Sequence, residues 1–466
     1  MKNSKIGCVI LAAGKGTRMK SETPKVLFNI CGQPMIGYLL ETISKIKEIS
    51  KVYIVVGYKA EEVKSKILEI VDSKLKDKII FVYQEDQKGS GDALLKVKKH
   101  IDPSIAYLIV LSADVPLVSE NTIKMLIMSH LKEKTDCSVL TTTLDNPVGY
   151  GRIVRDVSNR FVDIIEEVDA NESQKKIKEV NTGIYIFTLP ILWSALVKVK
   201  PNNKKKEYYL TDVVKFISSK SAISTLDSQE VKGINTRKDL LEVTELVRRK
   251  IIERFLLNGV NIYLPDTVYI DIHTKISEDT EIFSGCVICN SEIGRNCKIG
   301  PYSYLDNTKV ADDTQILYSY IIDTQIGNNC KIGPFSRIIN NTKIHNNVII
   351  GNFVEITRSI INDYVKIRHH SYIGDTEIEE KVNVGAGSIT CNYDGIKKNK
   401  TYIGKNTFVG SNVNLVAPIK VGKNVMIAAG STVTKDIPDN AFVIARVKES
   451  IKPQHRIIKK LFNLNM

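Results

Sequence analysis

The sequence predicts an α/β domain with a mainly parallel sheet, joined by a long helix to a left-handed parallel β-helix. Three observations support this fold class. Strand-like runs alternate with helix-like segments early in the chain, one charged segment has helical spacing, and an aliphatic residue later recurs every six positions. We place the two domains at residues 1–235 and 259–447, the connecting helix at 236–258 and a basic tail at 448–466.

The first 235 residues alternate between short β-branched runs and longer amphipathic segments, as successive βαβ units do. Such units build a mainly parallel sheet that helices cover, and ligands bind beyond the carboxyl ends of its strands. The predicted strands are residues 6–11, 52–56, 79–83 and 107–111. The predicted helices are residues 35–47, 60–71 and 119–131.

The connecting segment has apolar residues at helical spacing between Lys, Arg and Glu, which predicts a long amphipathic helix. These apolar positions are Leu240, Val243, Leu246, Val247, Ile251 and Phe255.

After Gly259 the apolar period changes to six residues, which is neither helical nor typical of a hairpin. In a β-helix with three-sided coils, each such residue stacks on its copy one coil away. Glycine follows many of them, and we expect it to serve the tight corners. The repeat includes Ile326, Ile332, Ile338, Ile344, Ile350 and Ile356, and later Ile403, Val409, Leu415, Val421, Ile427 and Val433.

Two segments depart from this repeat. A polar, basic stretch between Ser388 and Tyr402 interrupts it, and we expect this stretch to project as a loop of the kind that often carries function. The tail at 448–466 loses the period and is rich in Lys and Arg, which predicts a mobile or partner-docking segment.

The composition excludes several classes of protein. With 43% hydrophobic and 25% charged residues and no long apolar run, the chain is predicted to be neither a membrane protein nor disordered. Eight cysteines in 466 residues are too sparse for a disulfide scaffold, which suits a reducing compartment, and we expect a cytoplasmic protein.

A glycine-containing loop follows the first predicted strand, in the string that runs from Leu11 to Lys25. Its glycines let backbone N–H groups approach a phosphate, while Arg18 and Lys25 offer positive charge to a nucleoside triphosphate. The string is not a Walker A motif. Its glycine pair alone is as typical of an ordinary strand-to-helix turn as of a phosphate-binding loop.

The full string resembles the signature of sugar-nucleotide pyrophosphorylases. Along its whole length the chain resembles the bifunctional N-acetylglucosamine-1-phosphate uridylyltransferases/glucosamine-1-phosphate N-acetyltransferases. The resemblance implies a Rossmann-like nucleotidyltransferase domain that takes UTP and a sugar 1-phosphate. It implies nucleotide and sugar contacts from Leu11, Ala12, Ala13, Gly14, Arg18, Lys25, Gln84, Gly89, Ser90, Ser112, Ala113, Asp114, Gly151, Glu166, Asn181 and Asn235. Among these, the resemblance implies that Gln84, Gly89 and Ser90 hold the uracil edge and that Gly151, Glu166 and Asn181 bind the sugar.

The same resemblance implies that Asp114 and Asn235 are the protein ligands of Mg²⁺. A cation suits a reaction that brings two polyanions together, and two protein oxygens suit Mg²⁺, which keeps waters and phosphates as its other ligands. Without the resemblance, an aspartate at a strand end such as Asp114 is as typical of a helix or turn cap as of a metal ligand. The sequence departs from the family at Ala113, where glycine is usual, and at Asp92, where histidine is common.

In the β-helix the resemblance implies a trimeric acyltransferase with His369 as the general base, since imidazole titrates near neutrality. The adjacent His370 leaves the choice ambiguous from the residues alone, and the resemblance implies His369 because His369 keeps the family's spacing to Tyr372, Asn383, Asn392 and Tyr393. Tyr372 and Asn383 are implied to bind the acetyl acceptor. The residues implied to contact acetyl-CoA are Ala386, Asn392, Tyr393, Ser411, Ala429 and Arg446.

Two positions where the family holds the sugar phosphate with a cation are Ile339 and Thr357 here. Each lost charge-assisted contact is worth roughly 1.5 to 3 kcal/mol. The nearby cations that we consider as replacements are Arg337, Arg358, Lys366 and Arg368.

We therefore predict a bifunctional enzyme that acetylates glucosamine 1-phosphate and then transfers a uridylyl group to the product. The alternatives are a uridylyltransferase whose β-helix has lost acetylation or changed its acceptor, and a β-helix that serves only as a scaffold. Cys286 and Cys289 have metal-ligand spacing, but they lack a second pair of matching spacing and are expected to pack in the core.

The net charge of +14 also suits a nucleic-acid-binding protein. The positive excess lies within residues 1–240 and 391–466, while residues 241–390 are slightly acidic. The positive regions are those that would receive UTP, sugar phosphate and acetyl-CoA. We therefore expect small phosphorylated metabolites as partners, and neither nucleic acid nor a membrane.

Overall fold

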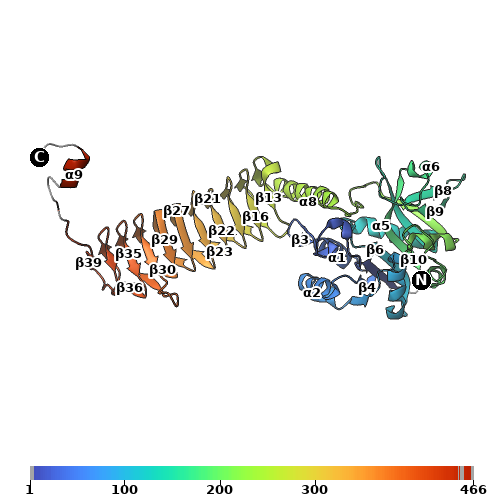
Figure 1. Cartoon of the computed structure of the whole chain (residues 1–466), viewed down its shortest axis with the longest axis horizontal. Coiled ribbons are helices and arrows are strands. Elements are labelled where there is room, and N and C mark those ends of the chain that lie inside the picture. The colour runs from blue at the N-terminus through green and yellow to red at the C-terminus, as the bar shows by residue number, and fades with distance from the viewer. Residues whose placement is uncertain (1–4, 450, 452–455, 463–466) are drawn as a thin grey trace. The chain divides into compact units, whose positions relative to one another are not determined.

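The computed structural model describes residues 5–449, 451 and 456–462. It contains two compact units, Met1–Val247 and Arg248–Met466, which are described separately below (Figure 1). The basic tail predicted at 448–466 lies partly outside the described residues; within it, the structure describes the short helix α9 (Arg456–Leu461).

The first unit is built on a mixed sheet, whose strands are β1 (Lys5–Leu11), β4 (Ile49–Val56), β5 (Ile79–Tyr83), β6 (Ile105–Ser112), β7 (Cys137–Thr143), β8 (Arg152–Arg155), β9 (Phe161–Ile165), β10 (Glu179–Thr188) and β11 (Lys220–Ser224). The main strand order is β11-β7-β10-β6-β1-β4-β5. Strand β1 is parallel to β4 and β6, β4 is parallel to β5, and β7 is parallel to β11. Strand β10 runs antiparallel to both β6 and β7. The predicted mainly parallel sheet is confirmed along its main strand order, with β10 as the exception there; off this path, β8 runs antiparallel to β10 and β9.

Helices cover both faces of this sheet. They are α1 (Met35–Ser44), α2 (Ala60–Ile70), α3 (Ser73–Lys76), α4 (Ser90–Val97), α5 (Glu120–Glu133), α6 (Glu172–Lys175) and α7 (Leu189–Leu196). One buried cluster joins α1, α2 and α5 to the sheet, through residues such as Leu39, Ile67 and Leu126. A second cluster joins α4 and α7 to it, through residues such as Leu94 and Leu192. The predicted strands and helices are all present, with ends that differ by a few residues.

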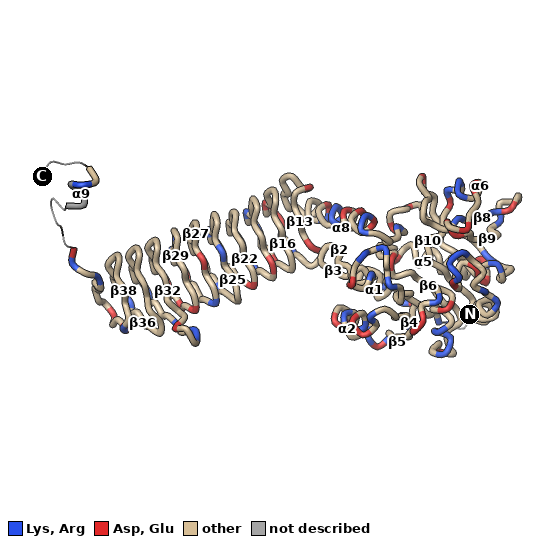
Figure 2. The backbone as a smooth tube through the Cα atoms, viewed as in Figure 1, with Lys and Arg blue, Asp and Glu red and all other residues tan. Residues whose placement is uncertain are grey.

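Short elements connect these pieces. They are η1 (Thr17–Met19), η2 (Lys25–Leu27), η3 (Lys98–His100), η4 (Thr211–Phe216) and the hairpin of β2 (Asn29–Ile30) and β3 (Gln33–Pro34). The predicted connecting helix is α8 (Arg237–Leu257), along which basic and acidic residues are interspersed (Figure 2). Within residues 5–449, 451 and 456–462, no helix combines the length and the apolar character that a membrane span requires.

The second unit is a parallel β-helix, entered through η5 (Pro265–Thr267). Its larger sheet contains β12 (Asn261–Ile262), β13 (Tyr269–Ile270), β15 (Glu281–Ile282), β16 (Val287–Cys289), β18 (Lys298–Ile299), β19 (Tyr304–Asp306), β21 (Gln315–Ile316), β22 (Tyr320–Ile322), β24 (Lys331–Ile332), β25 (Arg337–Ile339), β27 (Ile349–Thr357), β29 (Lys366–Gly374), β31 (Asn383–Val384), β32 (Ile389–Cys391), β34 (Phe408–Val409), β35 (Asn414–Val416), β37 (Met426–Ile427), β38 (Thr432–Val433) and β39 (Phe442–Val443). Its smaller sheet contains β14 (Lys275–Ile276), β17 (Glu292–Ile293), β20 (Lys309–Val310), β23 (Thr324–Ile326), β26 (Thr342–Ile344), β28 (Ile360–Ile361), β30 (Thr376–Ile378), β33 (Thr401–Ile403) and β36 (Ile419–Val421).

The aliphatic repeat forms buried columns that run along this β-helix. In one column each residue pairs with its copy in the next coil, which confirms the stacking that the period predicts. The column contains Ile299, Ile316, Ile332, Ile350, Ile367, Val384, Val409 and Ile427. The step from Val384 to Val409 contains the interruption predicted between Ser388 and Tyr402, and the register continues beyond it.

The glycines of the repeat act mainly through close approach of neighbouring coils. At Gly351, a Cβ would lie 1.8 Å from the carbonyl oxygen of Arg368, so only glycine fits there. Many corners with positive φ are instead occupied by asparagine, for example Asn329 and Asn347. The expectation that glycine serves the corners is therefore correct at Gly300, where φ is +104°, but not as a rule.

The buried histidine His130 makes the stability of the first unit sensitive to acid. Burial lowers the pKa of His130 from 6.5 to about 4, and its Nδ1 lies 2.9 Å from Ser138 Oγ. Between pH 6.5 and 4 the unfolded chain binds a proton at this residue that the folded chain does not. The free energy of unfolding should therefore fall by up to about 3 kcal/mol as the pH drops through this window.

Urea unfolding followed by the fluorescence of Trp193 measures this effect, because Trp193 is the single tryptophan and lies in α7. The His130→Asn variant should lose this part of the pH dependence, whereas His100→Asn, at an exposed histidine, should retain it. Equal pH dependence in all three proteins would contradict the assignment to His130.

Candidate active sites

The nucleotide loop and the end of β6 meet beside the start of α8. Lys25 Nζ lies 2.6 Å from Asp114 Oδ2 and 3.1 Å from Asn235 Oδ1, and Arg18 Nη2 lies 2.7 Å from the same Asn235 oxygen. The backbone N–H of Ala113 donates to Leu11 O, which fixes the ends of β1 and β6 to each other. Two cations and two oxygen ligands predicted from distant parts of the sequence are thus brought into one cluster.

Asp114 is ionised in this cluster. Burial alone would raise the pKa of its carboxyl group, but the Lys25 ammonium and the hydroxyl of Ser112, 2.6 Å from Asp114 Oδ1, hold that pKa below its usual value. Asn235 is held separately, because its backbone N–H donates to Asp239 Oδ2 at the start of α8. Both predicted metal ligands are therefore fixed in place as oxygen donors.

The group predicted to hold the uracil lies next to this loop. Gln84 is buried, and its Nε2 donates to Asp92 Oδ2 at 2.7 Å and to Gly89 O at 3.1 Å. Asp92, a departure from the family pattern, thus orients the Gln84 amide. At Gly89 φ is +113° and a Cβ would lie 2.5 Å from Tyr208 O, so glycine is required. Ser90 Oγ accepts a hydrogen bond from the Leu210 backbone N–H.

The group predicted to hold the sugar also forms a cluster. A Cβ at Gly151 would lie 3.6 Å from both Asn181 Cβ and Glu166 Oε1, so the three residues are neighbours. Burial raises the pKa of Glu166, although a hydrogen bond from Thr211 Oγ1 opposes the rise. Glu166 and Thr211 line a cavity of about 490 Å³.

Two glycines, Gly57 and Gly183, lie between these groups and join them into one site. A Cβ at Gly57 would lie 2.9 Å from Ala13 O and 3.1 Å from Gln84 O, which places the loop beside the uracil group. A Cβ at Gly183 would lie 3.5 Å from Ser112 Cβ, and the Gly183 N–H donates to Asn181 Oδ1. Asp114 does not line the cavity beside Glu166. The cavity therefore lies at the end of the site where the sugar contacts are predicted.

In the β-helix, His369 lies on β29 beside Asn352 of the preceding coil. His369 Nδ1 lies 2.9 Å from Asn352 Oδ1. An amide oxygen accepts, so Nδ1 carries the proton and Nε2 is left as the basic nitrogen. His370 lies at a corner with φ of +37°. The contact with Asn352 therefore distinguishes His369 from His370 as the candidate base, a distinction that the two residues alone do not give.

Four of the six residues predicted to contact acetyl-CoA follow one another along a single corner of the coils. The N–H of Gly387 donates to His370 O, and the N–H of Asn412 donates to Ala386 O. The N–H of Gly430 donates to Ser411 O, and Arg446 Nη1 donates to Ala429 O at 3.0 Å. Ala386, Ser411, Ala429 and Arg446 therefore form a row that continues from the histidines.

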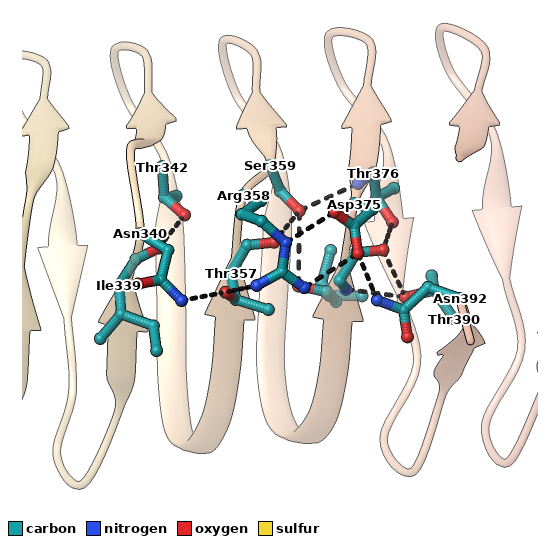
Figure 3. A network of polar contacts seen from close by, with 12 residues as sticks. Ile339, Asn340, Thr342, Thr357, Arg358, Ser359, Asp375, Thr376, Thr390 and Asn392 are labelled. Atoms are coloured by element: carbon teal, nitrogen blue, oxygen red, sulfur yellow. Dashed lines mark hydrogen bonds and ion pairs between the residues drawn. The ribbon is translucent and has the colours of Figure 1, made fainter. Parts of the chain in front are cut away.

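A second group surrounds Tyr372 and Asn392. A Cβ at Gly374 would lie 2.6 Å from both Tyr372 Oη and Asn392 Nδ2, so these side chains meet over a glycine. Asn392 Nδ2 also donates to Asp375 Oδ2, which Arg358 holds in a paired contact (Figure 3). Within this group, Tyr372 lies three residues beyond His369 on the same strand, β29.

The positions of the two missing cations are buried in the β-helix. Ile339 is 8% exposed and Thr357 is 3% exposed, and the two are paired between β25 and β27. Of the proposed replacements, Arg337 pairs with Glu355 at 2.6 Å, and Arg358 pairs with Asp375. Within the described part of the chain, Lys366 and Arg368 of β29 form no ion pair.

Two predicted residues lie apart from these groups. Tyr393 is 61% exposed on the loop that interrupts the repeat, and its hydroxyl donates to Gly395 O in the same loop. Asn383 pairs with Lys366 and Phe408 along the sheet. In the chain as described here, no side-chain hydrogen bond ties either residue to the His369 row or to the network around Tyr372.

Sequence reasoning missed the residues that support the predicted ones. These are Asp239, Thr211, Asn352 and Asp375. The ion pair of Arg358 with Asp375 was also missed, since Arg358 was considered only as a phosphate ligand. Asn352 and Asp375 each lie one coil away from a residue that the sequence singles out, His369 and Arg358 respectively.

Cys286 directly precedes β16, and Cys289 is the last residue of that strand. Cys286 is fully buried and Cys289 is partly buried, and all eight cysteines are free thiols. No group of three or more His, Cys, Asp or Glu side chains within residues 5–449, 451 and 456–462 is arranged to hold a metal ion. Cys286 therefore packs in the core of its coil, as expected, whereas Cys289 is only partly buried there.

Comparisons with known proteins match this architecture. The model of the nucleotidyl transferase family matches residues 8–243, and that of the bacterial transferase hexapeptide (six repeats) matches residues 323–358 and 400–435. The fold and the sites thus define a nucleotidyltransferase domain followed by a hexapeptide-repeat transferase domain.

Curated relatives match nearly the whole chain. The bifunctional protein GlmU of Thermoanaerobacter pseudethanolicus is 43% identical over 97% of this chain and 98% of its own length. Those of Acetivibrio thermocellus and Caldanaerobacter subterraneus are each 41% identical, over 97% and 95% of this chain and 97% and 96% of their own lengths. The chain belongs to the family of bifunctional GlmU proteins.

Proposed function

We propose that this protein makes UDP-N-acetylglucosamine in two steps. It transfers an acetyl group from acetyl-CoA to glucosamine 1-phosphate, and then a uridylyl group from UTP to N-acetylglucosamine 1-phosphate with release of pyrophosphate. The observation that carries the proposal is that one chain contains both the cluster around Asp114 and the row that begins at His369. This chain is similar to a bifunctional relative over 97% of its length. It is therefore an enzyme with two separate reactions.

In the uridylyl transfer, a phosphate oxygen of the sugar 1-phosphate attacks the α-phosphorus of UTP. The bond from that phosphorus to the bridging oxygen breaks, and pyrophosphate leaves. Arg18 and Lys25 would neutralise the phosphates, while Gln84 would bind the uracil edge and Glu166 the sugar.

We further propose that Asp114 and Asn235 hold Mg²⁺. Their oxygens fit a cation, because Lys25 Nζ lies within 3.1 Å of both of them. Oxygen donors from a carboxylate and an amide suit a hard divalent ion. When bound, the ion would neutralise charge on the phosphates of UTP.

The same contacts predict that Lys25 competes with a divalent cation for these oxygens. In the absence of nucleotide, Lys25→Met should bind Mn²⁺ at least about tenfold more tightly than the wild type, because it removes a positive charge at the ligands. Titration of Mn²⁺ followed by electron paramagnetic resonance measures the affinity. Lys45→Met, which removes a surface ion pair with Glu41 on α1, is the control and should leave it unchanged. Weaker Mn²⁺ binding by Lys25→Met would contradict the competition.

In the acetyl transfer, the amino nitrogen of glucosamine 1-phosphate attacks the thioester carbon. His369 Nε2 takes the proton from that nitrogen, the C–S bond breaks, and CoA leaves as the thiol. Ser411 would support the oxyanion, and the row from Ala386 to Arg446 would bind acetyl-CoA. Tyr372 and Asn383 would bind the acceptor.

The decisive experiment assays the purified protein for both reactions. We expect pyrophosphate release from UTP with N-acetylglucosamine 1-phosphate, and CoA release from acetyl-CoA with glucosamine 1-phosphate. Absence of the first reaction would refute the proposal as a whole. Absence of only the second would favour a uridylyltransferase whose β-helix serves another acceptor or assembly, as the buried Ile339 and Thr357 suggest.

We also propose that the protein acts in the cytoplasm as a homotrimer. Eight free thiols suit a reducing compartment, and hexapeptide repeats are typical of oligomeric transferases. Sedimentation equilibrium should give three times the chain mass of 52.2 kDa, and a monomer would exclude the trimer.

A further inference from the structure

Arg358 is held by hydrogen bonds to Asp375 and Thr357. Its Nε lies 2.7 Å from Asp375 Oδ1, its Nη2 lies 2.9 Å from Asp375 Oδ2, and its Nη1 lies 3.0 Å from Thr357 Oγ1 (Figure 3). The Asp375 side chain is only 14% exposed and that of Arg358 is 31% exposed. The pair therefore forms a planar, two-bond contact that is largely removed from water.

Asp375 in turn sets the orientation of Asn392. The hydrogen bonds from Arg358 hold the pKa of Asp375 below its usual value and outweigh burial, which alone would raise that pKa, so the Asp375 oxygens only accept. Asn392, which is 6% exposed, must present its Nδ2 to Asp375 Oδ2, and it does so. The amide oxygen Oδ1 of Asn392 is then directed away from Asp375, as Figure 3 shows.

We propose that Arg358 is a positioning residue for acetyl transfer: by holding Asp375 it fixes the Asn392 amide, so that Asn392 Oδ1 accepts a hydrogen bond from an N–H group of a substrate. This inference rests on the proposed acetyltransferase function. The N–H donor is an amide of acetyl-CoA or the amino group of the sugar, and acetyl-CoA is the expected one because Asn392 belongs to its predicted contacts.

The same geometry argues against Arg358 as a replacement for the missing phosphate ligands. Asp375 occupies the Nε and Nη2 edge of the guanidinium, so a phosphate could form a two-bond contact at that edge only by displacing Asp375. Displacement of Asp375 would also release Asn392, which the acetyl transfer needs. A positioning role and a phosphate-binding role therefore predict opposite results when Asp375 is changed.

The test is steady-state kinetics of CoA release with both substrates varied, in Arg358→Met, Asp375→Asn and the double variant. We expect each single change to raise the KM for acetyl-CoA about tenfold and to leave that for glucosamine 1-phosphate within about twofold, as for the loss of one oriented hydrogen bond. The double variant should be no worse than either single one, because both changes release the same amide. Arg358→Lys, which keeps one hydrogen bond to Asp375, should lie between Arg358→Met and the wild type.

The alternative outcomes are distinct. If both single variants raise the KM for glucosamine 1-phosphate instead, the role of Arg358 stands and the N–H donor is the amino sugar. If Arg358→Met raises that KM while Asp375→Asn lowers it or leaves it unchanged, Arg358 is a phosphate ligand and the inference is wrong. Unchanged kinetics in an active Arg358→Met enzyme would also overturn it, whereas a wild type that releases no CoA would refute the proposed function itself.

Two controls separate positioning from folding. Arg295→Met removes an arginine that bridges to Glu278 one coil away, far along the chain from the site, and it should leave both KM values unchanged. Uridylyl transfer by every variant should equal that of the wild type, since it depends on the other unit. A misfolded Arg358→Met protein would be recognised by its circular dichroism, and Asp375→Asn, which is nearly isosteric, then decides the question.

Discussion

Asp114→Asn should lower the rate of uridylyl transfer about 10³-fold, the effect expected when a preorganised charge at a phosphoryl-transfer site is removed. The change takes away the carboxylate that would hold the metal ion and that pairs with Lys25 at 2.6 Å. It leaves a side chain of nearly the same size that still accepts one hydrogen bond. The loss should therefore appear in the rate rather than in the folding of the domain.

The measurement is pyrophosphate release from UTP and N-acetylglucosamine 1-phosphate, with CoA release by the same protein as an internal control. Asp145→Asn is a matched substitution, because Asp145 pairs with Lys178 at the surface and is fully exposed. It should leave both activities unchanged. An Asp114→Asn enzyme within tenfold of the wild type would contradict the metal and phosphate assignment of this residue.

His369→Asn should lower the rate of acetyl transfer by about 10² to 10⁴, the range expected for loss of a general base. Asparagine retains polarity next to Asn352 but has no basic nitrogen to replace Nε2. The amine of the acceptor would then have to lose its proton to water. Uridylyl transfer by the same variant should be unaffected.

His370→Asn is the matched control for this prediction. His370 lies at a corner with φ of +37°, a region that asparagine tolerates well, so the substitution should preserve the coil. It should retain CoA release close to that of the wild type. If His370→Asn were the inactive variant and His369→Asn the active one, the assignment of the base would be reversed.

Much of the architecture follows from local sequence patterns. The six-residue period predicts the β-helix because each aliphatic residue must stack on a copy of itself, and columns such as Ile332, Ile350 and Ile367 show this. The nucleotide site was also predictable in outline, because its residues lie at strand ends and in one short loop. The contact between the Asn235 backbone N–H and Asp239 could not be predicted, because Asp239 resembles any other charged helix residue until the start of the helix is known.

The supporting contacts of the second site were hidden for a different reason. Asn352 and His369 are 17 residues apart, as are Arg358 and Asp375, and each pair joins neighbouring coils. The length of a coil varies along the chain, so the pairing of polar residues cannot be counted from the sequence alone. Asp375 also has positive φ, which makes it resemble the many Asp and Asn residues that merely turn corners.

The coil-by-coil stacking has a consequence for how the second site keeps its shape. In a stack where each coil touches only its neighbours, opening starts at an end and progresses inward, so amide protection declines toward that end. Arg446 follows the last strand, β39, while His369 lies several coils inside. The Arg446 end of the row that would bind acetyl-CoA is thus expected to open before the His369 end. A ligand bound at that end would stabilise the terminal coils against opening.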